Sequence, residues 1–243
     1  MALESDSLER LVPDELIVEE STGGETLRLH VERYEFAARE ACKGRVLDMA
    51  CGAGYGTRIL ADAPGVTSVV GVDISEEAVR YATRRYAGPE TRFISSDAMQ
   101  FSDPEPFDTI VSLETIEHLD GDPQDFVQHL RTLLHRDGVL IASAPTTPSV
   151  DVNPNHSHDF TPHSFRKLFQ DCGFREIECF RQVQAVSVAA VLRKNEKRMS
   201  GVRKNLVAYY ATHPAALARR IAVTLRHGFN NHYSTIVWAL VDE

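Results

Sequence analysis

The sequence predicts an α/β chain built on one doubly wound, mostly parallel sheet of seven strands with helices on both faces. Short apolar runs alternate with amphipathic, helix-like segments from residue 45 to residue 182. Three alternating glycines follow the first of these runs. The first three runs each end at or beside an acid, namely Asp48, Asp73 and Asp97. Acids and glycines gathered after strands are typical of open α/β sheets, which bind ligands at that edge.

The elements up to the fifth strand follow in order. Residues 1–26 read as a loose lead-in, and a helix over 27–41 places Leu27, Val31 and Tyr34 on one face. Ser75, followed by two glutamates, predicts a helix start, and Asp137-Gly138 predicts a helix end. Strands are expected at 45–50, 69–73, 91–95, 107–113 and 138–144, and helices at 57–63, 75–86 and 122–135.

The last third of the chain contains a basic insert. A helix is expected at 162–172 and a strand at 174–182, and Thr235 to Val241 forms the final strand. The insert, residues 183–232, reads as two helices, at about 185–199 and 202–226. The expected organisation is therefore one domain over 27–182 and 233–243, interrupted by this insert before its last strand.

The loop after the first strand predicts a small-molecule site. Glycines let the backbone approach a ligand closely, and the first N–H groups of the following helix face the same space. A dinucleotide site has the spacing G-x-G-x-x-G, whereas Gly52, Gly54 and Gly56 are spaced two and two. Asp48 at the strand end would repel a pyrophosphate and attract an ammonium group. The combination favours S-adenosylmethionine (SAM), which has a cationic amino acid end and no phosphate.

Two further acids indicate an adenosine ligand. Asp73 ends the second strand, where a carboxylate commonly accepts both ribose hydroxyls. Asp97 follows the third strand and could accept the adenine amino group. Each acid taken singly is also compatible with a helix cap or a turn. The predicted cofactor-binding residues are Asp48, Ala50, Gly52, Gly54, Asp73, Ile74, Asp97 and Ala98.

These residues resemble class I SAM-dependent methyltransferases, whose first motif is D-x-G-x-G-x-G. Asp48, Gly52 and Gly54 match it, and Ala50 replaces the first glycine. The resemblance covers residues 27–182 and the last strand, near 234–241. It implies a Rossmann-like fold and SAM as the methyl donor. In this family the helix before the first strand often closes over the cofactor, which makes His30, Arg33 and Tyr34 candidates for contact with the cofactor or the acceptor.

A second group of residues predicts a metal site. The fourth strand leads into Glu114-Thr115-Ile116-Glu117-His118, and spacings of three and four place the two glutamates and the histidine on one side of a helical turn. A later loop with His156 and His158 is expected over the same edge of the sheet. Carboxylates and imidazoles without a thiolate suit Mg²⁺ or Mn²⁺ better than structural zinc. A solvated helix start with ordinary loop histidines is the structural alternative.

The pattern E-x-x-E-H with a later histidine loop resembles three methyltransferase groups, which act on small-RNA 3′-terminal 2′-hydroxyls, on ubiquinone precursors and on sugar hydroxyls. In the RNA group the later histidine lies four residues before an aromatic-Thr pair, a position that His156 holds here. The resemblance implies the metal ligands Glu114, Glu117, His118 and His156. His158 is then available as the general base. A histidine base acting without a metal stays open.

Charge is unevenly distributed along the chain. The net charge is −9, yet residues 183–232 contain nine Lys or Arg and one Glu, so this insert is +8 and the remainder is −17. The insert is expected to meet an anionic surface, a partner or the acidic body of its own fold. A substrate lid, a homodimer contact and a peripheral membrane contact all stay open.

Composition excludes several classes of protein. No apolar run approaches the ~20 residues of a membrane span, and residues 1–10 are too charged for a signal peptide. Four cysteines without C-x-x-C spacing indicate a reduced, cytoplasmic protein. An acidic body argues against nucleic acid as a partner.

The sequence therefore predicts a SAM-dependent O-methyltransferase, assisted by Mg²⁺ or Mn²⁺. A saccharide hydroxyl is the favoured acceptor, because few aromatic residues lie outside core-like positions. A catechol or quinone precursor and an RNA 3′-terminal 2′-hydroxyl are alternative acceptors. A noncatalytic binding protein that keeps the cofactor fold is the alternative from another class.

Overall fold

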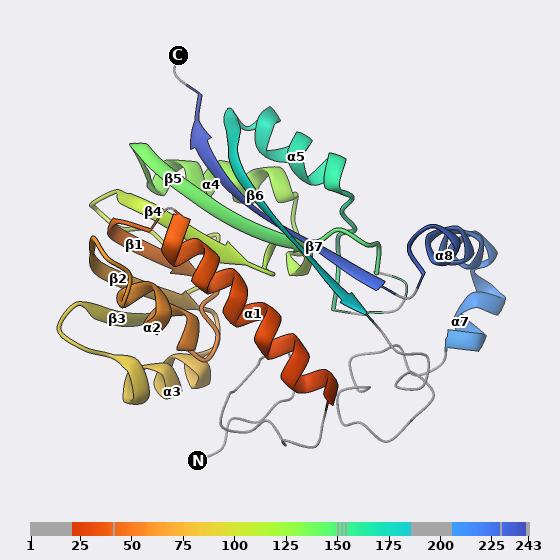
Figure 1. Cartoon of the computed structure of the whole chain (residues 1–243), viewed down its shortest axis with the longest axis horizontal. Coiled ribbons are helices and arrows are strands. Elements are labelled where there is room, and N and C mark those ends of the chain that lie inside the picture. Colours follow the sequence, from red (N-terminus) through yellow and green to blue (C-terminus); the bar gives the residue numbers. More distant parts are fainter. Residues whose placement is uncertain are drawn as a thin grey trace.

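The computed structural model describes residues 21–40, 42–149, 151, 153, 155–185, 206–228 and 230–241. These residues form a single sheet with helices on both faces, and an additional helical pair lies beyond one end of the sheet (Figure 1). The elements are α1 Ser21–Glu40, β1 Gly44–Met49, α2 Tyr55–Ala61, β2 Val66–Asp73, α3 Glu76–Tyr86, β3 Thr91–Ser95, β4 Phe107–Leu113, the 3-10 turn η2 Ile116–His118, α4 Pro123–Leu133, β5 Leu134–Pro145, α5 Pro162–Asp171, β6 Phe174–Ala185, α7 Leu206–Thr212, α8 Pro214–His227 and β7 Asn230–Leu240.

The predicted sheet is confirmed. Its strand order is β3-β2-β1-β4-β5-β7-β6, and β7 runs antiparallel to both β5 and β6 while the other pairs are parallel. The strand order reverses between β1 and β4. On one side of β1 lie β2 and then β3, and on its other side lie β4 and then β5. Such a reversal opens a crevice at the carboxyl ends of the strands, where open α/β sheets bind ligands.

Two apolar layers enclose the sheet. Successive strand residues point to opposite faces, so Leu47 packs with α4 and α5 while its neighbour Val46 packs with α1 and α2. In the first layer the rings of Phe169 and Trp238 stack, with centroids 4.8 Å apart. Helices on both faces leave only the strand ends for a ligand site.

Several element boundaries differ from the prediction because contacts distant in sequence set them. α1 begins at Ser21 rather than at residue 27, and its early turns are held by β6, since the Gln184 side chain donates to Thr26. β6 extends past residue 182 to Ala185 because it pairs with Asn230 of β7. β5 begins at Leu134 rather than at residue 138, so α4 ends before Asp137-Gly138.

The basic insert is only partly described. Its predicted first helix, at 185–199, lies outside the described residues except for Ala185, which ends β6, and residues 1–20 of the lead-in also lie outside them. The predicted second helix is two helices, α7 and α8, with Pro214 as the first residue of α8. No helix in the described ranges is both long and apolar enough to cross a bilayer.

Candidate functional site

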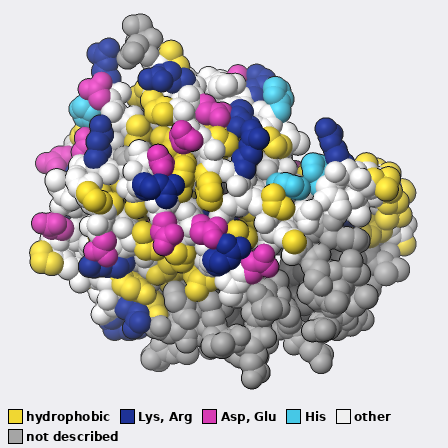
Figure 2. Space-filling view, in the orientation of Figure 1, with side chains coloured by type: hydrophobic (Ala, Val, Ile, Leu, Met, Phe, Trp, Pro, Cys, Tyr) yellow, Lys and Arg dark blue, Asp and Glu magenta, His cyan; other side chains and the backbone are white. Residues whose placement is uncertain are grey.

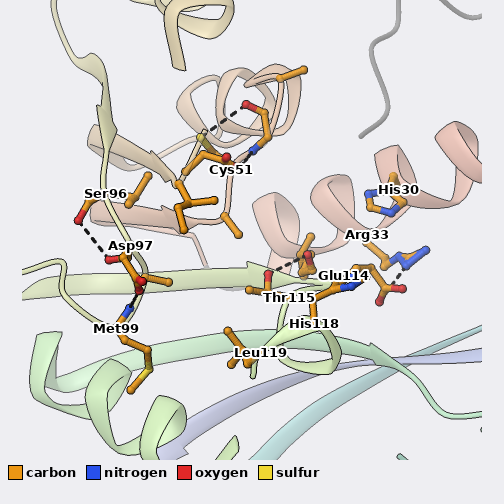
Figure 3. A pocket seen from close by; sticks show the side chains of 18 of the residues that line it. His30, Arg33, Cys51, Ser96, Asp97, Met99, Glu114, Thr115, His118 and Leu119 are labelled. Atoms are coloured by element: carbon orange, nitrogen blue, oxygen red, sulfur yellow. Dashed lines mark hydrogen bonds and ion pairs between the residues drawn. The ribbon is translucent and has the colours of Figure 1, made fainter. Parts of the chain in front are cut away.

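A cavity of about 510 Å³ lies at the carboxyl ends of the strands. Its volume falls in the range of small-molecule sites. Side chains reach it from the loop after β1, from the ends of β2 and β3, from the β4–η2 segment and from α1 (Figure 3). We call the part formed after β1, β2 and β3 the cofactor end and the part formed by α1, η2 and β7 the acceptor end.

The loop after β1 takes left-handed backbone conformations at two cavity-lining positions. Ala50 has φ 64° and Gly52 has φ 55°. The first glycine of the methyltransferase motif is therefore replaced by an alanine that still adopts the glycine-like conformation, at a cost of about 1 kcal/mol. Nothing lies within 4 Å of a Cβ added at Gly52, so this glycine leaves open space on the cavity side.

Gly54 and Gly56 are needed for close packing against neighbouring helices rather than for space at the ligand. A Cβ at Gly54 would lie 2.6 Å from the Ala82 Cβ, and one at Gly56 would lie 2.1 Å from the ring of Tyr34. Gly54 does not line the cavity. The expectation that all these glycines admit a ligand is therefore wrong for Gly54 and Gly56: they let α1 and α3 approach the loop.

Asp48 also lies away from the cavity, contrary to its predicted role. It is fully buried and accepts hydrogen bonds from the Tyr34 hydroxyl at 3.2 Å and from the Thr57 hydroxyl at 2.6 Å. Burial raises the pKa of its carboxyl to about 7, against the lowering effect of the two hydroxyls. Asp48 thus fastens α1 and α2 under the cofactor loop.

The raised pKa of Asp48 predicts a stability that depends on pH. Because its pKa is about 7 in the folded chain, against 3.8 for an unperturbed aspartate, the folded state binds more protons between these values. The stabilising contribution of Asp48 should therefore be fully present below about pH 4 and fall, by at most about 1.4 kcal/mol per pH unit, up to pH 7. In Asp48→Asn this fall should disappear, as measured by urea unfolding of the cofactor-free protein at several pH values. An equal pH dependence in the variant and the parent would contradict the assignment.

The cofactor end is polar on one side and apolar on the other. The Asp73 carboxylate accepts the N–H groups of Gly52 and Ser75, each at 2.9 Å, which ties the loop after β1 to the end of β2. Next to it, the Ile74 side chain is 62% exposed and lines the cavity, as Ala98 does. Asp97 lines the same end and accepts the Met99 N–H at 2.7 Å. Carboxylates beside an exposed aliphatic wall suit the hydroxyls and the flat base of a nucleoside.

Glu114 and Arg33 form an ion pair at the acceptor end. The Arg33 guanidinium is 1% exposed and lies 3.2 Å from the Glu114 carboxylate (Figure 3). It also lies 4.5 Å from the Tyr233 ring centroid. Glu114 has φ 52°, lies before η2 and accepts the Ser143 hydroxyl at 2.8 Å. The prediction that Glu114 shares a helical face with Glu117 is therefore wrong, because the left-handed residue turns the chain before the helical turn begins.

The remaining predicted ligands do come together. Glu117, His118 and His156 each offer a ligand atom, and these atoms lie within 4.8 Å of one another. The loop with His156 is held on η2, because the Ser157 N–H donates to the Glu117 carbonyl at 2.8 Å and the His118 Nδ1 lies 3.0 Å from the Asn155 carbonyl. We call Glu117, His118 and His156 the Glu-His cluster. His118 also lines the cavity, so the cluster borders the acceptor end.

Both imidazoles of the cluster are suited to bind a cation. The Asn155 carbonyl can only accept, so the His118 Nδ1 donates to it, and Nε2 is the ring nitrogen left for a cation. This Nε2 lies 3.9 Å from the Glu117 carboxylate. Burial, followed by the proximity of His118, lowers the pKa of His156 to about 4. His156 is therefore neutral at pH 7, as a metal ligand must be.

His158 does not reach the cavity. Its Nε2 lies 2.9 Å from the Gly121 carbonyl and so donates to it, and the residue is absent from the cavity wall. This position does not support the predicted role of His158 as general base. Apart from His118, the histidine on the cavity wall is His30 of α1. Tyr55 and Tyr233 also line the cavity. Tyr55 lies between two glycines of the loop after β1, whereas Tyr233 belongs to no motif of the sequence.

Comparisons with known proteins agree with the fold. Residues 46–138 match the family described as methyltransferase domain. A candidate methyltransferase from Bacillus halodurans C-125 is similar in structure, with a TM-score of 0.63 and 16% identity over 86% of this chain and 97% of that one. No curated protein matches the sequence.

Two further structures show what this fold accommodates. The N-methyltransferase NodS from Bradyrhizobium japonicum WM9, solved with S-adenosylhomocysteine, has a TM-score of 0.59 and 15% identity over 93% of this chain and 90% of that one. The 4+2 cyclase SpnF has a TM-score of 0.61 and 17% identity over 94% of this chain and 86% of that one. At these identities the similarity establishes the Rossmann-like methyltransferase fold, and the reaction has to be argued from the site.

Proposed function

We infer from the methyltransferase-domain match, the fold and the cavity that this chain is a SAM-dependent methyltransferase, and we propose that it methylates a hydroxyl of a saccharide or a glycosylated metabolite. The observation that carries the proposal is the continuity of the cavity, which joins the loop after β1 and Asp73 to Arg33, Glu114 and His118. A SAM molecule held at the cofactor end would leave the acceptor end for a second molecule.

The charges of the cavity support a cationic cofactor with a carboxylate. Asp73 and Asp97 supply negative charge along its wall, which attracts the ammonium and sulfonium groups of SAM. Arg33 is the buried cation at the same wall. Its planar guanidinium is suited to a carboxylate, so we assign it to the carboxylate of SAM, whose amino acid end would reach from the cofactor end to the border of the acceptor end.

The proposed reaction moves one methyl group and one proton. The acceptor oxygen attacks the methyl carbon, the carbon–sulfur bond breaks, and the electron pair stays on sulfur, which leaves S-adenosylhomocysteine. We assign the role of general base, which accepts the proton of the acceptor hydroxyl, to His30 at the acceptor end. Binding both molecules in one cavity aligns oxygen, carbon and sulfur.

The Glu-His cluster fits a divalent metal ion. A bound ion would lower the pKa of an acceptor hydroxyl that it coordinates and hold that oxygen in place. Two imidazoles and one carboxylate suit Mn²⁺ or another transition metal better than Mg²⁺, which prefers oxygen ligands. We therefore propose Mn²⁺ ahead of Mg²⁺, with Glu117, His118 and His156 as ligands and Glu114 reserved for Arg33.

The wall of the acceptor end favours a saccharide over the alternative acceptors. His30, Glu114 and His118 offer hydrogen-bonding groups at that end, which match a molecule rich in hydroxyls. Asp120, Asp122 and Asp125 line the same cavity. Their charges would repel the phosphates of an RNA end.

A transfer assay tests the proposal. The protein is incubated with SAM labelled in the methyl group and with panels of saccharides, catechols and RNA ends, with Mn²⁺, with Mg²⁺ or with excess chelator. Label is expected on a saccharide and to depend on added metal. Transfer to a catechol or to an RNA end instead would show that the acceptor is not a saccharide. Binding of SAM without transfer to any acceptor would favour a noncatalytic protein of this fold.

A further inference from the structure

Helix α8 presents an apolar stripe on its outer side. Leu217, Ile221 and Leu225 follow one another at a spacing of four residues and are 39%, 52% and 85% exposed. Residues four apart are neighbours on a helix surface, so the three side chains form one row. Figure 2 shows hydrophobic side chains gathered at the edge of the molecule where α8 lies. Exposed apolar patches on soluble domains mark contact surfaces.

Basic side chains also lie on the exposed side of α8, where Ala218 and Ala222 separate them from this stripe. Arg219 and Arg226 are seven residues apart, which places them on the same side of the helix, and both are exposed. No described residue forms an ion pair with either of them, whereas Arg220 is bound by Asp151. Residues 206–228 contain three arginines, two histidines and no acid. We call Leu217, Ile221, Leu225, Arg219 and Arg226 the α8 surface.

The opposite side of α8 is fixed to the body of the protein. Ala216 is buried, and the Arg220 guanidinium donates to both carboxylate oxygens of Asp151 and to the Pro148 carbonyl. The Tyr210 hydroxyl of α7 donates to Asp151 at 2.6 Å. These contacts hold α8 with its apolar stripe outward. Strand β7, which carries Tyr233 of the cavity wall, begins shortly after α8.

We propose that the α8 surface docks on an anionic lipid bilayer. A helix with an aliphatic stripe and exposed arginines buries the stripe among acyl chains while the guanidinium groups meet lipid phosphates. A second copy of the chain fits this surface less well, because a two-fold contact would bring the same arginines of both copies together without an acid of α7 or α8 between them. The proposal is independent of the methyl-transfer reaction.

Vesicle binding tests the proposal on the full chain. Wild type is expected to float with vesicles of phosphatidylcholine and phosphatidylglycerol, to bind pure phosphatidylcholine weakly, and to lose binding as salt is raised. Ile221→Glu should lower the partition coefficient about tenfold. Removing either arginine, as in Arg226→Gln, should lower it roughly fivefold.

Ile177→Glu is the matched control. Ile177 of β6 is 49% exposed, against 52% for Ile221, and lies outside the α8 surface. The control should bind vesicles like wild type, and thermal unfolding should show that both variants fold. Absence of binding to anionic vesicles, or an equal loss in both variants, would overturn the proposal. Sedimentation velocity adds a second check, because a dimer of wild type that Ile221→Glu dissociates would assign the surface to a second copy instead.

Discussion

Changing Glu117 to glutamine is expected to lower the rate of methyl transfer about 100-fold and to leave the affinity for SAM unchanged. Glu117 is 1% exposed and is the one carboxylate of the Glu-His cluster. Glutamine has nearly the same shape, so the packing is preserved while the negative charge that favours a divalent cation is lost. Single-turnover transfer from labelled SAM measures the rate, and calorimetric titration with Mn²⁺ measures the metal affinity.

His158→Gln is the neighbouring control for this experiment. The glutamine amide can replace the hydrogen bond from the His158 Nε2 to the Gly121 carbonyl, and residue 158 lies outside the cavity wall. Transfer should therefore continue at close to the wild-type rate. If Glu117→Gln retained full transfer, or if wild type were insensitive to chelator, the metal would have no part in the reaction. If instead His158→Gln lost transfer with SAM binding intact, the general base would return to His158.

Asp73→Asn is expected to weaken SAM binding about 10- to 150-fold, since hydrogen bonds to a charged group are worth about 1.5–3 kcal/mol. The carboxylate has two functions that an amide cannot combine: it holds the Gly52 and Ser75 N–H groups and it gives the cofactor end a negative charge. Calorimetric titration with SAM and with S-adenosylhomocysteine measures the loss directly. Both ligands should be affected, because both carry the ribose that this carboxylate is expected to bind.

Asp108→Asn separates this effect from a general loss of stability. Asp108 also accepts a backbone N–H, that of Arg45 at 2.8 Å, but it lies near the start of β4 and does not line the cavity. Its replacement should lower the unfolding temperature without changing SAM affinity. Equal SAM affinity in Asp73→Asn and wild type would remove the cofactor assignment from this end of the cavity, and with it the proposed function.

Most of the cofactor end could be predicted because its signals are local. A strand end followed by an acid and a loop with glycine is recognisable over ten residues or fewer, and the parallel sheet then brings such ends together at one edge. Ala50, Gly52, Asp73, Ile74, Asp97 and Ala98 all line the cavity, as that reasoning expects. Asp48 and Gly54 do not line the cavity, because their partners, Tyr34 and Ala82, belong to helices that the loop motif does not include.

The acceptor end was harder to predict. Spacing alone grouped Glu114 with Glu117, but the left-handed conformation at Glu114 separates them and directs the first carboxylate to Arg33 on α1. The loop with His156 was expected over the carboxyl ends of the strands, close to Glu117 and His118. Its hydrogen bonds to these two residues hold it beside them. Nothing local could indicate Tyr233, since its place on the wall depends on the antiparallel insertion of β7 beside β5.

The sequence by itself determined the succession of strands and helices along the chain, the loop after β1, the acids at the strand ends and the basic character of the insert. Each of these features depends on hydrophobic periodicity, glycine content or charge within a short stretch of chain. The tertiary structure decided which of the acids face the cavity. Asp48 is buried under Tyr34 and Thr57, Glu114 is neutralised by Arg33, and Glu117 is left beside two imidazoles. A buried carboxylate takes the partner that compensates its lost hydration, and that partner is supplied by packing between elements far apart in the chain.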